Sequence, residues 1–266
     1  MMDFSKIAST YERESIVQKS AADILSTLLR ISSHDDVIDI GCGTGNLTKK
    51  IKSLTHGKVV GIDPSPGMIE EAILRLEGQD IIFHIGTAED LIEDGDFDVV
   101  FCNSAFQWLR DPKRAVDNFH KALRKGGRVG IQAPAKRVYC PNFIDAVERV
   151  REDSSLQRTF AHFQNPWFFL ETSDDYMNLF EESGFTVPFS KIEQVATLHS
   201  AEEVFRIFSS GAIAGYLNQD FYNVTLDEGY IEGFKEVIRN EFARQENQDG
   251  KVELLFNRIM LIAVKE

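Results

Sequence analysis

The amino-acid sequence predicts an α/β fold in which helices cover a mostly parallel β-sheet. Through the first 135 residues, short runs of β-branched and apolar residues alternate with segments whose apolar residues recur at helical spacing. A glycine-rich turn directly follows the first apolar run, where a parallel strand would pass into a helix. Strands that are covered on both faces appear in sequence as continuous apolar runs, which is the pattern seen here.

Five strands are expected in this first part, at residues 37–40, 58–63, 81–85, 97–103 and 127–133. A helix before the first strand is indicated by apolar residues at helical spacing: Val17, Ala21, Ile24, Leu25 and Leu28. A helix after the fourth strand is indicated in the same way by Ala115, Val116, Phe119 and Leu123. Gly126 and Gly127 are predicted to end that helix, because glycine tolerates left-handed dihedral angles.

The alternation stops beyond Pro134, where aromatic helical stretches are expected at 143–150, 160–169 and 176–180. Further helices are expected at 201–208 and 230–242, and the last two strands at 186–199 and 252–264. The sequence shows no repeat or flexible linker. We therefore predict a single domain, 1–266, with a core at 1–135 and mainly helical cap insertions at 136–185 and 200–250.

Composition narrows the possible functions. The chain has 266 residues, 43% of them hydrophobic, which is sufficient for a sizeable core. Its three cysteines, Cys42, Cys102 and Cys140, have neither disulfide nor zinc spacing, which is typical of a cytoplasmic protein. A net charge of -13 argues against nucleic-acid partners. The lack of a long apolar run argues against a membrane protein.

The glycine-rich turn carries the first functional signal. Gly41, Gly43 and Gly45 follow GxGxG spacing between a buried strand and a helix, and a ligand can lie against such a backbone. The dinucleotide fingerprint would need glycine where this chain has Asn46. Asp39 would repel a pyrophosphate, but it suits a positively charged ligand.

The ends of the second and third strands add polar groups. Asp63, in the sequence Gly-Ile-Asp-Pro, can accept hydrogen bonds from both hydroxyls of a ribose, although NAD enzymes also use an acid there. The third strand ends in Gly-Thr-Ala-Glu-Asp-Leu at 86–91, whose polar groups suit an adenine edge. For Glu89 and Asp90 the alternative is a helix N-terminus whose dipole they complement.

Together these strand ends resemble the class I S-adenosylmethionine (SAM)-dependent methyltransferases. The resemblance implies a Rossmann-like, seven-stranded, mostly parallel sheet with an antiparallel C-terminal hairpin. It also implies SAM as cofactor, with S-adenosylhomocysteine (SAH) as product, at the carboxyl edges of strands one to four. The cofactor-binding residues that it implies are Asp39, Gly41, Cys42, Gly43, Gly45, Asp63, Pro64, Met68, Thr87, Ala88, Glu89, Asn103, Ser104 and Ala105.

The segment 101–109, Phe-Cys-Asn-Ser-Ala-Phe-Gln-Trp-Leu, is similar to trans-aconitate methyltransferases and malonyl-acyl-carrier-protein O-methyltransferases. The resemblance implies O-methylation of a small-molecule or acyl-carrier-linked carboxylate by in-line transfer, with Tyr11, Gln107 and Trp108 positioning the acceptor. A carboxylate is ionised near pH 7 and needs no strong base. The six histidines show no ligand spacing, so no metal is expected.

Several alternatives stay open at this point. The acceptor atom could instead be nitrogen or carbon, and the chain could be a non-catalytic SAM- or SAH-binding regulatory protein. Core packing is an equal alternative for Trp108. The sequence leaves five further side chains without a role, namely Arg137, Tyr139, His162, Trp167 and Arg258. A monomer or weak homodimer is expected from the surface composition.

Overall fold

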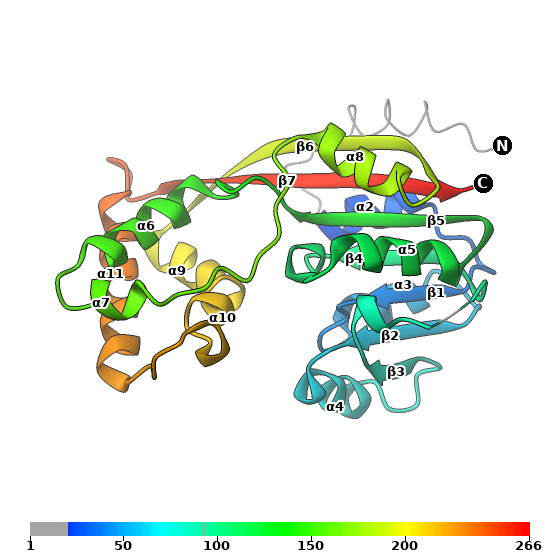
Figure 1. Cartoon of the computed structure of the whole chain (residues 1–266), viewed down its shortest axis with the longest axis horizontal. Helices are drawn as coiled ribbons and strands as arrows, with labels where there is room; N and C mark the ends of the chain where they lie inside the picture. Colours follow the sequence, from blue (N-terminus) through cyan, green and yellow to red (C-terminus); the bar gives the residue numbers. More distant parts are fainter. Residues whose placement is uncertain (1–20, 93) are drawn as a thin grey trace. The chain divides into compact units, whose positions relative to one another are not determined.

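The computed structural model describes residues 21–92 and 94–266 and contains a seven-stranded sheet in the order β3-β2-β1-β4-β5-β7-β6 (Figure 1). The strands are β1 (Val37–Ile40), β2 (Val59–Asp63), β3 (Ile82–Ile85), β4 (Phe97–Asn103), β5 (Leu123–Pro134), β6 (Phe185–His199) and β7 (Val252–Lys265). The pairs β1–β2, β1–β4, β2–β3 and β4–β5 are parallel, whereas β7 runs antiparallel to β5. The predicted fold class is therefore confirmed.

Helices connect the strands. They are α2 (Ala21–Leu29), α3 (Asn46–Lys52), α4 (Pro66–Arg75), α5 (Pro112–Ala122), α6 (Pro141–Glu152), α7 (Gln157–Phe160), α8 (Ser173–Glu181), α9 (Ala201–Ser210), α10 (Ile213–Tyr216) and α11 (Glu228–Arg244), with 3-10 turns η2 (Ala88–Asp90), η3 (Phe106–Trp108) and η4 (Gln219–Phe221). Several begin at a side-chain cap that is visible in the sequence. Ser65 precedes Pro66 at the start of α4, and Ser200 forms a capping box with Glu203 at α9.

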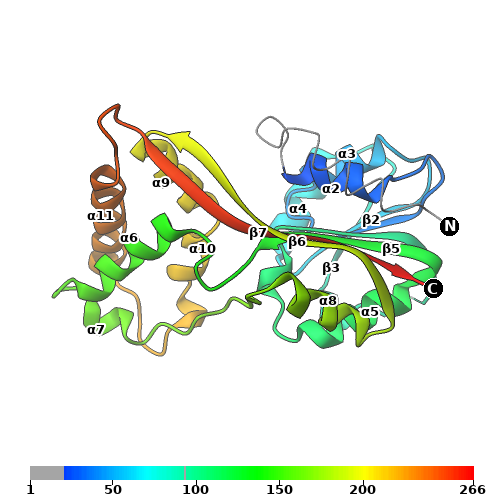
Figure 2. The same ribbon diagram turned by 90° about the horizontal axis from the view of Figure 1, so that it is seen from above.

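Helices α2 and α3 cover one side of the sheet, and α5 and α8 cover the other (Figure 2). An apolar core of buried side chains lies on each face. Side chains alternate along each strand, so Val37 packs toward α2 while Ile38 packs toward α5. The burial of both faces explains why the central strands are apolar without interruption.

The expected end of the helix after β4 was wrong. Helix α5 ends at Ala122, and the next residue already pairs with β4, through Leu123 and Phe97. The β4–β5 register then shifts, so that Arg128 lies opposite Val99. Gly126, with φ of 80°, lies within this irregularity and is not a helix cap. A bulge and a helix end both use glycine at positive φ, so the sequence did not distinguish them.

The helix expected at 160–169 was also wrong. Helix α7 ends at Phe160, and residues 164–170 form no helix. Asn165 precedes Pro166, and the residue before a proline is disfavoured in the α conformation. The apolar residues at 164–170 therefore do not mark a helix.

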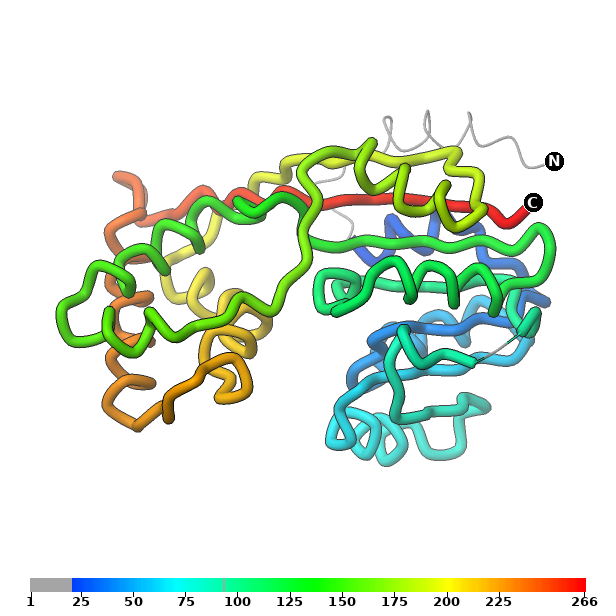
Figure 3. Tube along the Cα trace, in the orientation of Figure 1, coloured from blue at the N-terminus to red at the C-terminus, as the bar shows by residue number. Residues whose placement is uncertain are grey.

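The chain divides into two compact units. The first contains the described residues up to Arg137 with Phe168–Glu193 and Arg258–Glu266, and the second contains Val138–Trp167 and Gln194–Asn257. Figure 3 shows the chain leaving the first unit after β5, returning for α8, and leaving and returning again through β6 and β7. The segment 168–185, expected in the helical cap, belongs to the sheet-containing unit. The single-domain expectation itself stays a prediction.

Membrane-spanning segments were searched for in the described part of the chain. None of its helices combines the length and the apolar character that crossing a bilayer requires.

Candidate functional site

The turn after β1 is fastened to the end of β2. The backbone N–H groups of Gly41 and Cys42 both donate to the carbonyl oxygen of Ile62, at 2.8 and 3.0 Å. Gly41, Gly43 and Gly45 have φ of 70°, 55° and 77°, in the left-handed region that favours glycine. The spacing of the three glycines thus reflects a backbone path that other residues would strain.

Asp63 organises this edge of the sheet. Its carboxylate accepts hydrogen bonds from the N–H groups of Gly43 at 3.0 Å and of Ser65 at 2.9 Å. Its carbonyl oxygen accepts from the N–H of Gly86 at 3.1 Å, which ties in the end of β3. The ends of β1, β2 and β3 therefore meet at one acidic residue, through its carboxylate and its backbone carbonyl.

The end of β4 closes against the same turn. A Cβ built on Gly41 would lie 2.3 Å from the Cβ of Ala105, so only glycine allows this approach. Ser104 has φ of 57°, which is unusual for a non-glycine residue. Its N–H donates to the carbonyl oxygen of Gln132 at 2.7 Å, and its hydroxyl donates to the side-chain oxygen of Gln132 at 3.2 Å. Two hydrogen bonds thus hold the unusual conformation.

Asp39 lies beneath the turn and is 2% exposed. Its carboxylate accepts a 2.6 Å hydrogen bond from the hydroxyl of Thr48, on the first turns of α3. Burial raises the pKa of Asp39 to about 7, and the nearby negative charge of Asp63 acts in the same direction. A positively charged ligand above the turn would favour the ionised form of Asp39.

The space beside the glycines differs from one to the next. A Cβ on Gly45 would lie 2.9 Å from the ring of Phe83, and the same ring lies 2.8 Å from a Cβ built on Gly61. A Cβ on Gly43 would meet no atom of residues 21–92 and 94–266 within 4 Å. Two of these glycines are thus required by packing, while Gly43 borders open space in which a ligand can lie.

The polar side chains that follow β3 form hydrogen bonds within the protein. The hydroxyl of Thr87 accepts from the N–H of Asp90 and thereby caps η2. Ala88 is buried. The carboxylate of Glu89 accepts from the N–H groups of Arg110 and Asp111, at 2.8 and 3.3 Å, just before α5 begins. Whether Thr87 and Glu89 also contact the cofactor stays a prediction.

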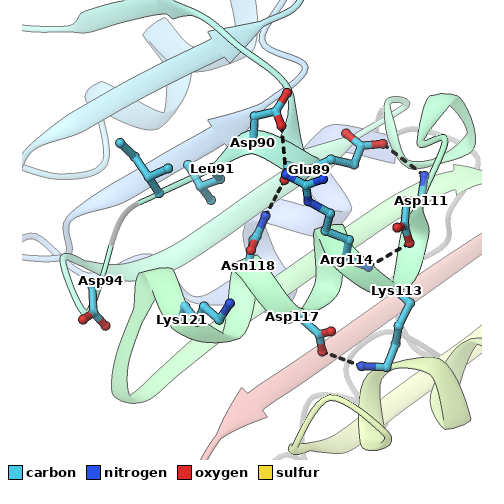
Figure 4. A pocket seen from close by; sticks show the side chains of 11 residues that line it. Glu89, Asp90, Leu91, Asp94, Asp111, Lys113, Arg114, Asp117, Asn118 and Lys121 are labelled. Atoms are coloured by element: carbon cyan, nitrogen blue, oxygen red, sulfur yellow. Dashed lines mark hydrogen bonds and ion pairs between the residues drawn. The ribbon is translucent and has the colours of Figure 1, made fainter.

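A groove of about 1050 Å³ borders η2 and α5 (Figure 4). Two ion pairs join charged side chains in it, with Arg114 3.1 Å from Asp90 and Lys113 bonded to Asp117. Of the predicted cofactor residues, Glu89 alone lines this groove. The groove therefore does not include the glycine turn, where the candidate site lies.

The residues predicted to position the acceptor are only partly brought to this edge. Tyr11 lies outside the described residues. Gln107 is buried in η3 directly after the β4 turn, whereas the neighbouring Trp108 is 36% exposed. Of the outer cofactor candidates, Pro64 is exposed after β2, and Met68 on α4 is 45% exposed.

The five side chains without a role are now placed. Arg137 is exposed, and Arg258 pairs with Glu193 at 2.7 Å in the first unit. The other three lie in the second unit, namely Tyr139, His162 and Trp167. His162 is exposed, while the indole of Trp167 packs directly on Gly215. Burial raises the pKa of the Tyr139 hydroxyl well above its usual value.

Sequence reasoning missed two supporting residues, Thr48 and Gln132. Each is a polar residue that is buried in an element of the sheet-containing unit, 0% and 5% exposed. A polar residue within a buried strand such as β5 is the signal that would have identified Gln132. Within residues 21–92 and 94–266, no three His, Cys, Asp or Glu side chains are grouped as a metal site requires.

Comparisons with known proteins agree with this geometry. A family model described as a methyltransferase domain matches residues 38–131. The chain is 30% identical to an uncharacterized methyltransferase of Schizosaccharomyces pombe over 97% of both chains. It is 38% identical to the malonyl-[acyl-carrier protein] O-methyltransferase of Hahella chejuensis, over 47% of this chain and 46% of that relative, which is about half of each.

Two further likenesses extend over nearly the whole chain. A trans-aconitate 2-methyltransferase of Deinococcus radiodurans is 26% identical over 96% of both chains. A solved structure from Bacillus halodurans, named as a methyltransferase, covers 93% of this chain and 99% of its own, with a TM-score of 0.61 and 18% identity. At that identity the structural likeness shows the fold alone.

Proposed function

The chain belongs to the methyltransferase family with SAM as its methyl donor, and we propose that its methyl acceptor is a carboxylate of a small molecule or acyl chain. The names of two relatives support this choice. One methylates an oxygen of a malonyl group on a carrier protein, and the other acts on trans-aconitate. Malonyl and aconitate groups both carry free carboxylates.

The observation that carries the proposal is the meeting of two acids at an open glycine turn. Asp63 lies against the turn and Asp39 beneath it, while the backbone at Gly43 faces open space. SAM carries positive charge on its sulfonium and ammonium groups, which carboxylates stabilise. Within the described part of the chain, the side-chain oxygen of Asn103 is buried without a hydrogen-bond partner and suits an ammonium donor. The residues therefore fit SAM.

A carboxylate acceptor also fits the chemistry of the segment after β4. When bound, SAM supplies an electrophilic methyl group, which an ionised carboxylate oxygen takes up without loss of a proton. The segment 103–108, Asn-Ser-Ala-Phe-Gln-Trp, contains no group that titrates near neutral pH. Its side chains can orient an acceptor and exclude water, which is the contribution that in-line transfer requires.

The cofactor assignment is tested by calorimetry of the protein with SAM and SAH, with NAD as control. Gly43→Ala adds a methyl group where the ligand is proposed to lie. Gly78→Ala is its matched control, because Gly78 also has positive φ and open surroundings but lies after α4. Both changes should cost about 1 to 2 kcal/mol of stability through left-handed strain. Only Gly43→Ala should weaken SAM binding, by about tenfold or more.

The acceptor is tested by SAH release from SAM in the presence of trans-aconitate, malonyl-acyl-carrier protein and a panel of dicarboxylates. Methyl ester formation on any of these supports the proposal. SAM binding together with turnover only of amines or carbon acids would refute the carboxylate assignment. Equal SAM affinity in the two glycine variants would show that the turn is purely structural.

A further inference from the structure

Gln107 holds an unpaired oxygen at the proposed acceptor side of the site. The residue is 8% exposed, and its side-chain N–H donates to the carbonyl oxygen of Ser104 at 2.8 Å. The backbone carbonyl oxygen of Gln107 accepts a hydrogen bond from the N–H of Phe168, also at 2.8 Å. Its side-chain oxygen Oε1 is buried and has no hydrogen-bond partner among the residues that the structure describes.

The orientation of this amide is fixed by its partner. A backbone carbonyl oxygen can only accept, so the amide nitrogen must face Ser104. Turning the amide over would place two oxygens against each other and lose the hydrogen bond. Oε1 therefore presents an acceptor, and a group that satisfies it must donate.

The carbonyl of Ser104 is itself held firmly in place. Its residue occupies a left-handed conformation, and two hydrogen bonds to Gln132 secure it. The next residue, Ala105, abuts the glycine turn at Gly41. Gln107 is thus anchored within three residues of the proposed cofactor site. A strained, well-secured turn that maintains an unpaired buried oxygen points to a ligand contact.

We propose that Oε1 of Gln107 accepts a hydrogen bond from a hydroxyl or N–H group on the methyl acceptor. The inference rests on the proposed function and narrows its substrate class. The acceptor is then a carboxylate with a hydrogen-bond donor close to the methylated group. A bare polycarboxylate offers only oxygen acceptors and would leave Oε1 unpaired, with two like partial charges facing each other.

The test uses matched pairs of acids that differ in one hydroxyl, namely malate with succinate and 3-hydroxyglutarate with glutarate. SAH release gives kcat/KM for each acid, and the ratio within a pair cancels any general loss of activity. Wild-type protein should prefer the hydroxylated acid by about tenfold. Gln107→Leu should bring that ratio close to one while SAH affinity by calorimetry is retained.

Gln132→Leu serves as the control variant. It loosens the Ser104 turn but leaves the oxygen of Gln107 in the chain, so the preference for the hydroxylated acid should persist. Comparing Gln132→Leu with Gln107→Leu therefore separates the hydrogen bond to the acceptor from a general disturbance of the turn.

Each other outcome is decisive. Equal use of both members of a pair, or an unchanged ratio in Gln107→Leu, would overturn the inference and leave the carboxylate assignment intact. Weaker SAH binding in Gln107→Leu would place the contact on the cofactor and not on the acceptor. If SAM binds but no carboxylate is methylated, the proposed function fails, and this inference fails with it.

Discussion

At the scale of single residues, the least expected feature is the buried carboxyl of Asp39. It accepts a hydrogen bond from the hydroxyl of Thr48, and burial raises its pKa to about 7. A carboxyl group whose pKa rises on folding destabilises the folded protein in its ionised form. The negative charge of Asp39 would offset this cost by stabilising the positive charge of bound SAM.

Asp39→Asn tests this cost directly. The usual pKa of Asp is about 3.9. The wild-type free energy of unfolding should therefore fall as pH rises from about 4 to about 7, as the folded protein resists ionisation. The variant lacks this loss, so its stability advantage over wild type should grow by about 2 kcal/mol between pH 5 and pH 8.

Urea unfolding at the two pH values measures this difference. Asp94→Asn, at an exposed loop position, is the control and should change little at either pH. Parallel pH dependence in the wild type and Asp39→Asn would contradict the raised pKa. Weaker SAM binding by the stabilised variant would show that the cost is retained for function.

At the scale of elements, the second unit owes its order to aromatic packing among short helices. The ring of Trp167 lies 4.8 Å from that of Tyr216, and the rings of Phe208 and Tyr216 stack at 5.9 Å. Glycine at 215 in α10 lets the indole lie against the backbone. Trp167 is therefore accounted for by packing within its unit.

Gly215→Ala should destabilise this unit. The added Cβ would lie 2.2 Å from the indole of Trp167, so the indole must move. Overpacking of this kind costs about 1 to 3 kcal/mol. Gly67→Ala in α4 is the matched control, since its Cβ meets nothing within 4 Å and alanine favours helices. Thermal unfolding that ranks the two variants equally would show that the contact relaxes freely.

At the scale of the whole molecule, the chain connects its two units repeatedly. It crosses between them at 137–138, 167–168, 193–194 and 257–258, and β6 and β7 each continue through a crossing. Strands shared in this way favour unfolding as one cooperative event. The expectation of a single domain rests on that connectivity.

The two tryptophans of the chain, Trp108 and Trp167, report on one unit each. SAH at 100 times its Kd should stabilise the protein by about 2.7 kcal/mol. If unfolding is cooperative, variants that retain only Trp108 or only Trp167 should show the same upward shift in fluorescence midpoint. A shift confined to the Trp108 reporter would show that the units unfold separately.

The sequence by itself determined the strand positions, the parallel sheet and the glycine turn, because these depend on local patterns of apolar and glycine residues. The β1 and β4 bounds were predicted residue for residue. The sequence did not determine the local structure where one residue type is compatible with two kinds of structure. Gly126 proved to lie where the β4–β5 register shifts, and residues 164–170 proved to form no helix.

Only the tertiary structure decided how polar atoms are paired. It buried Asp39 against Thr48, directed Glu89 toward the start of α5, and fixed the orientation of the Gln107 amide against Ser104. Each outcome depends on which donor from a different segment reaches a given acceptor. The spacing of residues along the chain predicts the periodicity of a helix or strand. It does not predict these hydrogen bonds, because the partners are determined by distance in three dimensions.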